Sequence, residues 1–140
     1  MMVAKKVWIM LIALFLLPVT AAACGFGEKV AEGYENTEVK HAYQHWNQGA
    51  SSAVPFEFID VRTPEEYADG HIEGARLIPV QELEVRMNEV PKDKQVYVYC
   101  RSGKRSAQAA GILARAGYSN IENVLGGITA WKDAEYQVVK

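Results

Sequence analysis

Hydrophobic and polar positions follow two different periods along the chain, and their succession predicts strands that alternate with helices. Short runs that are typical of strands cover residues 56–61, 76–79, 96–99 and 120–125. Helical spacing of apolar residues, or a run of small helix-forming residues, covers residues 38–48, 80–90, 107–117 and 128–131. A further helix is expected after Thr63, because Thr caps a helix well and Pro64 suits its first position. This order of elements predicts an α/β domain with a largely parallel sheet.

The chain before this alternation is less regular. Residues 24–35 are Gly-rich and polar, which predicts a linker, and residues 30–34 within it are expected to form a short strand. Thr37 is a plausible N-cap for the helix over residues 38–48. The apolar face of that helix is formed by Val39, Ala42, Tyr43 and Trp46.

The polar face of the same helix carries Glu38, His41 and His45. Two histidines one turn apart can bind a metal ion, but neither a fourth ligand nor an H-E-x-x-H pattern accompanies them. We therefore expect solvated surface histidines and no metal site. Trp131, near the end of the chain, is expected in the core rather than at a contact surface.

Residues 1–23 have the layout of a secretory signal peptide. Lys5 and Lys6 form a basic start, an apolar run covers residues 7–17, and a small-residue tail ends at Ala23. The apolar run is shorter than the roughly 20 residues that span a bilayer. We therefore expect cleavage after Ala23 and export to the periplasm, with a retained anchor as the alternative.

Cys24 would be the first residue of the exported chain, and its position raises the possibility of a lipid that tethers the domain to a membrane. Lipoprotein signals usually have Leu three residues before the cysteine, whereas this chain has Ala21. A lipid anchor and simple cleavage before Cys24 both stay open. The expected organisation is a signal peptide over residues 1–23, a linker over residues 24–35 and one domain over residues 36–140.

Composition limits the class of protein. The sequence has 140 residues, of which 49% are hydrophobic, so it can build one ordinary domain around its own core. It has two cysteines, too few for a disulfide framework. The net charge of −2 becomes more negative if the lysines of the signal peptide are removed. Because a nucleic-acid-binding domain is expected to show a basic face, we do not expect nucleic acid as a partner.

The candidate chemistry lies in the loop after the strand over residues 96–99. Cys100 follows this strand directly, and binding sites gather at the carboxyl ends of parallel strands. A thiol between a strand and a helix sits among unpaired backbone amides at the positive end of the helix dipole. Such a position lowers the pKa of a thiol and favours the thiolate, so Cys100 is a candidate nucleophile.

The neighbours of Cys100 argue against an inert buried thiol. Most free cysteines only fill space in the core, but three cations, Arg101, Lys104 and Arg105, would be an unusual environment for a buried structural thiol. Their charges suit an anionic substrate. Gly103 lets the backbone turn tightly and approach a bound anion closely.

Three separate motifs in this order resemble the single-domain rhodaneses, over roughly residues 36–135. They are D-V-R with G-H-I-E-G-A at residues 60–62 and 70–75, C-R-S-G-K-R-S at residues 100–106, and G-G-I-T-A-W at residues 126–131. The resemblance implies a five-stranded parallel sheet flanked by helices on both faces. It also implies an enzyme that needs no cofactor and moves a sulfane sulfur from thiosulfate to cyanide or a thiol.

In this resemblance Cys100 is the sulfur carrier. Its thiolate attacks the outer sulfur of thiosulfate, sulfite leaves, and a persulfide remains until an acceptor takes its terminal sulfur. The residues expected to bind the substrate, through a nest of amides and through charge, are Arg101, Ser102, Gly103, Lys104, Arg105 and Ser106. Asp60 and Arg62 match the D-V-R element, which is expected to brace the site rather than to react.

Loop length separates this reading from related folds. Cysteine phosphatases need a C-x5-R loop, whereas Arg105 here gives C-x4-R, which favours sulfur over phosphate. Relatives that use mercaptopyruvate resemble a loop with Gly after the Cys and without this run of cations, so thiosulfate is the expected donor by analogy. A phosphatase or arsenate reductase on the same fold is the less favoured alternative.

A second alternative comes from a different class. The domain would then be a non-turnover persulfide carrier or a redox-sensing binding module that acts through Cys100. In either case a reactive thiol outside the cytoplasm needs to be kept reduced. A thioredoxin-like protein or a small dithiol is the expected reductant.

Overall fold

The computed structural model describes residues 27–140. The predicted signal peptide over residues 1–23 and the candidate tether at Cys24 lie outside the described residues. Within residues 27–140, no helix is long and apolar enough to cross a membrane.

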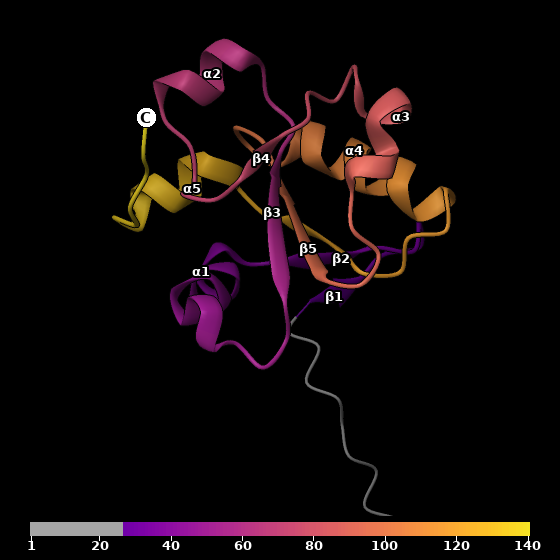
Figure 1. Ribbon diagram of the computed structural model, residues 1–140, viewed down its shortest axis with the longest axis horizontal. Coiled ribbons are helices and arrows are strands. Elements are labelled where there is room, and N and C mark those ends of the chain that lie inside the picture. The colour runs from indigo at the N-terminus through magenta and orange to yellow at the C-terminus, as the bar shows by residue number, and fades with distance from the viewer. Residues whose placement is uncertain (1–26) are drawn as a thin grey trace, which may run out of the picture.

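A six-stranded sheet runs through the centre of the domain, with the order β1-β2-β6-β5-β3-β4 (Figure 1). The strands are β1 (Glu28–Lys29), β2 (Glu35–Thr37), β3 (Phe56–Asp60), β4 (Arg76–Leu77), β5 (Gln95–Tyr99) and β6 (Ile121–Val124). Every neighbouring pair is parallel except β1 and β2, which are antiparallel. The predicted α/β class and its five parallel strands are confirmed, but the sheet is not wholly parallel, because β1 adds a sixth, antiparallel strand at one edge.

The additional strand also explains why the strand expected over residues 30–34 is wrong. These residues form the turn between β1 and β2, in which Val30 N donates to Tyr34 O and Gly33 N donates to Val30 O, both at 3.0 Å. Gly33 has a φ of +91°, a conformation that suits glycine. The apolar residues Val30 and Tyr34 pack against the core from this turn rather than from a strand.

Helices and short 3-10 turns connect the strands. They are α1 (Val39–Gln48), η1 (Gly49–Ser51), α2 (Pro64–Asp69), α3 (Leu83–Arg86), η2 (Met87–Glu89), α4 (Lys104–Arg115) and α5 (Gly127–Asp133). The helix expected over residues 80–90 is divided into α3 and η2. Glu38, not Thr37, is the N-cap of α1, because Thr37 still pairs with Val124 in the sheet.

The sheet separates two hydrophobic clusters, because successive side chains of each strand point to opposite faces. On one face, Val96 and Val98 of β5 meet Leu83 of α3 and Leu113 of α4. The residues that pack on the other face, beneath α1 and α5, include Phe58, Tyr97, Tyr99, Ala42 and Ile128. Helices on both faces, as predicted, are confirmed.

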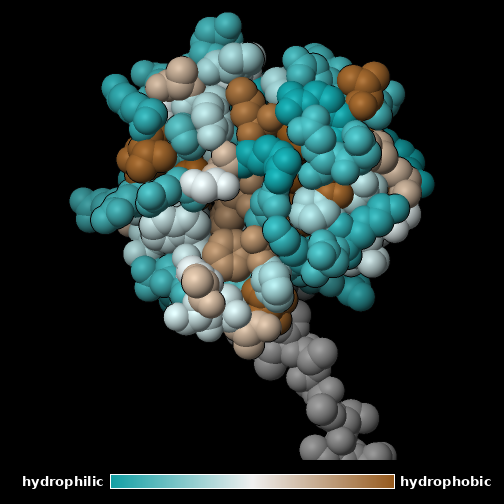
Figure 2. Space-filling view, viewed as in Figure 1, coloured by the Kyte–Doolittle hydropathy of each residue, from teal (hydrophilic) through white to brown (hydrophobic). Residues whose placement is uncertain are grey.

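Trp131 lies at the centre of the second cluster and is fully buried. Its ring contacts Phe58 and Tyr43 edge-on, and its Nε1 donates to Gln137 O at 2.8 Å. The prediction of a core tryptophan is therefore confirmed. The face shown in Figure 2 is mainly hydrophilic, with a band of apolar residues through its middle.

Candidate active site

Cys100 lies directly after β5, in the turn that leads into α4. Its side chain points to the face covered by α3 and α4 and is 1% exposed. It forms no disulfide within residues 27–140. The sulfur thus lies where the carboxyl end of a central strand meets the amino end of a helix, as the sequence predicts.

The turn directs hydrogen-bond donors at this sulfur. Gly103 N donates to Cys100 Sγ at 3.1 Å, and the Ser106 hydroxyl donates to it at 3.5 Å. Burial raises the pKa of Cys100. The Ser106 hydroxyl and the amides of Ser106, Ser102 and Gly103 lower it by more than burial raises it, so the net change is downward. These hydrogen-bond donors stabilise the thiolate of a buried sulfur.

The first turn of α5 holds the backbone at the start of the loop. Ile128 N donates to Cys100 O at 2.9 Å, and Thr129 N donates to Arg101 O at 3.1 Å. Because a trans peptide group points its C=O and N–H in opposite directions, the Arg101 carbonyl held by α5 leaves the Ser102 amide facing the sulfur. A side chain on Gly127 would place a Cβ 2.3 Å from Cys100 O, so only glycine permits this approach.

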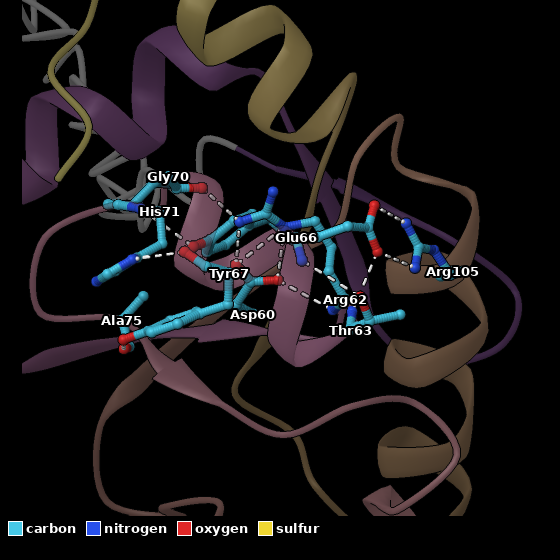
Figure 3. Close-up of polar contacts among 11 residues, drawn as sticks. Asp60, Arg62, Thr63, Glu66, Tyr67, Gly70, His71, Ala75 and Arg105 are labelled. Carbon is cyan, nitrogen blue, oxygen red and sulfur yellow. Dashed lines mark hydrogen bonds and ion pairs between the residues drawn. The ribbon is translucent and has the colours of Figure 1, made fainter. Parts of the chain in front are cut away.

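The three cations of the loop have different roles. Arg101 and Lys104 are exposed, whereas Arg105 is half-buried. Arg105 donates to both carboxylate oxygens of Glu66 at 2.8 Å (Figure 3). A guanidinium has five N–H donors, so this pair leaves Arg105 with others for a bound anion.

Glu66 itself is held by α2 as well as by Arg105. Thr63 Oγ1 accepts from Glu66 N at 3.3 Å and the Glu66 carboxylate accepts from Thr63 N at 3.1 Å, which forms a capping box at the start of α2. The cap expected at Thr63, with Pro64 following, is confirmed. The hydrogen bonds from Arg105 are the main reason that the pKa of Glu66 falls to about 2.

Asp60 and Arg62 lie beneath the loop and bind each other. Arg62 Nη2 donates to Asp60 Oδ2 at 2.6 Å and to Gly70 O at 2.8 Å, and Arg62 Nε donates to Asp60 Oδ1 at 2.9 Å (Figure 3). The guanidinium carbon also lies 5.7 Å from the centre of the Tyr99 ring. The pair therefore joins the end of β3 to the segment after α2, which agrees with a bracing role.

The chain matches the rhodanese-like domain family over residues 38–134. It belongs to this family. A sulfurtransferase of Allochromatium vinosum is 48% identical over 73 residues, which are 52% of this chain and 68% of that protein. The thiosulfate sulfurtransferase PspE of Escherichia coli is 44% identical over 71 residues, which are 49% of this chain and 68% of that protein.

A solved structure supports the same fold. The crystal structure of a rhodanese-related protein from Thermoplasma volcanium superposes with a TM-score of 0.67 at 32% sequence identity. The matched region covers 76% of this chain and 98% of that one. The recognition of a rhodanese fold from the three motifs is thus confirmed, while the boundaries of the domain and the signal peptide stay predictions.

In this rhodanese-like domain, the predicted site residues come together around one turn. Ser102, Gly103 and Ser106 lie close enough to lower the pKa of the Cys100 thiol. Lys104, Arg105 and Ser106 belong to α4, which begins three residues earlier than the helix expected from residue 107. Their roles in substrate binding stay predictions.

Two features of the site escaped the sequence reasoning. Glu66 was assigned no role at the site, although it pairs with Arg105 39 positions later. The G-G-I-T-A-W run served only as a motif of the resemblance, although Gly127 fixes the loop backbone. A sharper signal was present in both cases, because each element stands at the carboxyl end of a parallel strand, the same edge as Cys100.

The prediction for the histidines is partly wrong. His45 is only partly exposed, and its Nδ1 lies 2.8 Å from the Tyr97 hydroxyl, so it is not a solvated surface residue. No group of three or more His, Cys, Asp or Glu side chains in residues 27–140 is arranged to hold a metal ion.

Proposed function

We propose that this rhodanese-like domain is a thiosulfate sulfurtransferase that works through a Cys100 persulfide. The observation that carries the proposal is the environment of the sulfur: Gly103 N and the Ser106 hydroxyl both donate to it, and its pKa is lowered despite burial. The name of PspE supports thiosulfate as the donor, since that relative is a thiosulfate sulfurtransferase.

The first step forms the persulfide. The Cys100 thiolate attacks the outer sulfur of thiosulfate, a new S–S bond forms, and the S–S bond of thiosulfate breaks. Sulfite leaves with the electron pair of that bond, so no external oxidant or reductant is needed. Exposed Arg101 and Lys104 attract the doubly charged donor, and Arg105 offers its remaining N–H groups.

The second step returns the enzyme to its starting state. Cyanide or an acceptor thiolate attacks the terminal sulfur, and the Cys100 thiolate leaves with the bonding electrons. The products are thiocyanate or an acceptor persulfide. The same donors, Gly103 N and the Ser106 hydroxyl, stabilise Cys100 as an anion in this step.

Steady-state kinetics with thiosulfate and cyanide test the proposal. A covalent intermediate predicts thiocyanate formation with parallel double-reciprocal lines. The Cys100→Ala variant is expected to form no thiocyanate. An aryl phosphate is the control substrate, because the C-x4-R loop predicts no phosphate release. Phosphate release that depends on Cys100, without thiocyanate formation, would replace this proposal with a phosphatase.

The non-turnover carrier is the remaining alternative, because it uses the same sulfur. A carrier would form the persulfide once and pass it slowly to cyanide or to a small thiol such as dithiothreitol. Rapid multiple turnover supports the enzyme. A single burst that equals the amount of protein, followed by no further product, supports the carrier.

We also propose that the domain acts outside the cytoplasm, either free in the periplasm or tethered through a lipid on Cys24. The support is the layout of residues 1–23 alone. In that setting a thioredoxin-like protein or a small dithiol would keep Cys100 reduced. The intact mass of the protein from the native host distinguishes cleavage before Cys24, cleavage with lipidation, and retention of the leader.

A further inference from the structure

A cavity lies apart from the Cys100 loop, at the end of the sheet where β5 and β6 begin. It has a volume of about 970 Å³ and lies beside α1, with Gln95 and Ile121, the first residues of β5 and β6, in its lining. In Figure 1, α1 lies at the lower side of the domain and α2 at the upper side. Tyr97 lines the cavity and precedes Cys100 by three residues, or about 10 Å along a strand. Its side chain points to the other face of the sheet.

Glu122 of β6 is the central charged group of this cavity. In the register of the sheet it pairs with Glu35 of β2 on one side and with Tyr97 of β5 on the other. Side chains that are paired in this way point to the same face, so these three groups lie together in the cavity lining. Glu122 is only 9% exposed and forms no ion pair within residues 27–140, which is unusual for a carboxylate.

The surroundings of Glu122 disfavour its charge. Burial raises its pKa, and the neighbouring charge of Glu35 raises it again. The Thr37 hydroxyl faces the carboxyl and partly offsets this rise, but among residues 27–140 its Oγ1 makes no hydrogen bond of regular geometry. Thr37 is 1% exposed and also lines the cavity, so a buried polar atom remains for a ligand.

Two basic side chains of the cavity lining, His45 and Lys29, already have partners of their own. His45 Nε2 lies 2.9 Å from Val54 O, which can only accept, so Nε2 donates there, and Nδ1 lies 2.8 Å from the Tyr97 hydroxyl. Lys29 lies 3.8 Å from Glu35, but its side chain is 85% exposed to solvent. Lys29 therefore places no buried cation beside Glu122.

The rest of the lining mixes aromatic and aliphatic side chains, among them Tyr34 and Tyr43, with polar ones such as Gln44 and Asn47. The rings of Tyr43 and Tyr97 pack on the same face of the sheet as the two carboxylates, and aromatic rings beside carboxylates suit a ligand with an apolar body and a positive, donor-rich end. We propose that this cavity is a second binding site, for a small organic ammonium ion, with Glu122 and Glu35 as its charge partners. The proposal is independent of the sulfurtransferase proposal, because no residue of the Cys100 loop lines the cavity.

Benzylammonium is a suitable probe, and benzyl alcohol is its uncharged counterpart. The experiment follows the amide resonances of the ¹⁵N-labelled protein during titration with each compound at neutral pH. Saturable shifts are expected at Thr37, Tyr97 and Glu122, with benzyl alcohol at least about tenfold weaker. The resonances of the Cys100 loop are expected to stay unchanged.

Two variants assign the charge. Glu122→Gln is expected to weaken benzylammonium binding about tenfold, whereas Glu84→Gln, an exposed glutamate on α3, is expected to leave it unchanged. Glu35→Gln gives a second reading if Glu122→Gln does not fold. Equal binding of the ammonium and the alcohol, or unchanged binding in the folded Glu122→Gln and Glu35→Gln variants, would overturn the proposal. Shifts confined to another surface would do the same.

Discussion

Two arginine–carboxylate pairs flank the Cys100 loop, and they differ mainly in burial. The side chains of Asp60 and Arg62 are 0% and 5% exposed, whereas those of Glu66 and Arg105 are 29% and 30% exposed. Both pairs are joined by more than one hydrogen bond of at most 3.0 Å. The buried pair of Asp60 and Arg62 therefore braces the structure. The partly exposed pair of Glu66 and Arg105 instead affects the charge near Cys100.

Burial decides how strongly each pair depends on its partner. A buried charge that loses its partner pays the full cost of desolvation, about 3–5 kcal/mol. A pair that water can reach contributes at most about 1 kcal/mol. Asp60 and Arg62 should thus control folding, and Glu66 and Arg105 should mainly tune the charge near Cys100.

The largest effect is expected when the buried pair is broken. Asp60→Asn leaves the Arg62 guanidinium buried without its counter-charge, so the free energy of unfolding should fall by about 3–5 kcal/mol. Urea denaturation followed by tryptophan fluorescence measures this change. Asp93→Asn, at an exposed turn, is the control and should change stability by less than about 0.5 kcal/mol. A loss below about 1 kcal/mol for Asp60→Asn would show that the pair is not a brace.

The next largest effect is expected when the backbone contact between α5 and the Cys100 loop is disturbed. In Gly127→Ala the new Cβ would meet Cys100 O and Arg101 O, and the residue has a φ of +55°. We expect a loss of stability of about 2–4 kcal/mol together with slower alkylation of Cys100. Gly117→Ala is the matched control, because Gly117 has a φ of +90° with nothing within 4 Å of its Cβ position.

The outcome of this pair of variants is informative in both directions. Gly117→Ala should lose about 1 kcal/mol from its positive φ alone and should leave the reactivity of Cys100 unchanged. If both variants lose the same stability and keep the same thiol reactivity, close packing of α5 does not position the loop.

A smaller effect is expected at the sulfur itself. Ser106→Ala removes the hydroxyl that donates to Cys100 Sγ, so the pKa of Cys100 should rise. A hydrogen bond to a charged group contributes about 1.5–3 kcal/mol, so the rate of alkylation by iodoacetamide at pH 7 should fall by about tenfold or more. Rates measured across a pH series distinguish a raised pKa, which shifts the profile, from blocked access, which lowers its plateau. An unshifted profile contradicts the assigned role of Ser106.

The smallest effect on stability is expected at the rim. Glu66→Gln keeps the capping box of α2, since Gln can accept from the Thr63 amide, and removes only the charge. At pH 7 the loss should be at most about 1 kcal/mol. The freed Arg105 should lower the KM for thiosulfate by up to about threefold at low ionic strength, and added salt should reduce this change.

The pH dependence of the same variant follows from the lowered pKa of Glu66. Its pKa falls from 4.5 to about 2 in the folded protein, so the stabilisation is complete above about pH 4.5 and is lost as the pH falls toward 2. The difference between wild type and Glu66→Gln in urea denaturation should therefore shrink across this range. A difference that is constant from pH 7 to pH 2 would show that the charge of Glu66 does not stabilise the fold.

Local patterns in the sequence were enough for the fold class and for the reactive cysteine. Strand-forming residues before Cys100, small residues after it and the cap at Thr63 each act over a few positions. The same locality explains the misses. The hairpin of β1 and β2 depends on a turn at Gly33, and the early start of α4 depends on Gly103, whose φ of +95° ends the loop.

Which distant residues contact each other could not be read from the sequence, although their shared edge of the sheet could. The pairing of Glu66 with Arg105 and of His45 with Tyr97 depends on strand order, which places residues 39 and 52 positions apart side by side. Periodicity gave His45 a polar face, but β5 places a tyrosine hydroxyl directly beside it. Side-chain partners of this kind follow from tertiary packing, which hydrophobic periodicity does not encode.

The central claim is that Cys100 carries a transferable sulfur, and the intact mass of the protein tests it most directly. The reduced protein is measured alone, after thiosulfate and then after cyanide, with Cys100→Ser treated in parallel. We expect a gain of about 32 Da that maps to Cys100, disappears with cyanide as thiocyanate forms, and is absent from Cys100→Ser. A reduced, folded wild-type protein that gains no mass from thiosulfate would contradict the claim.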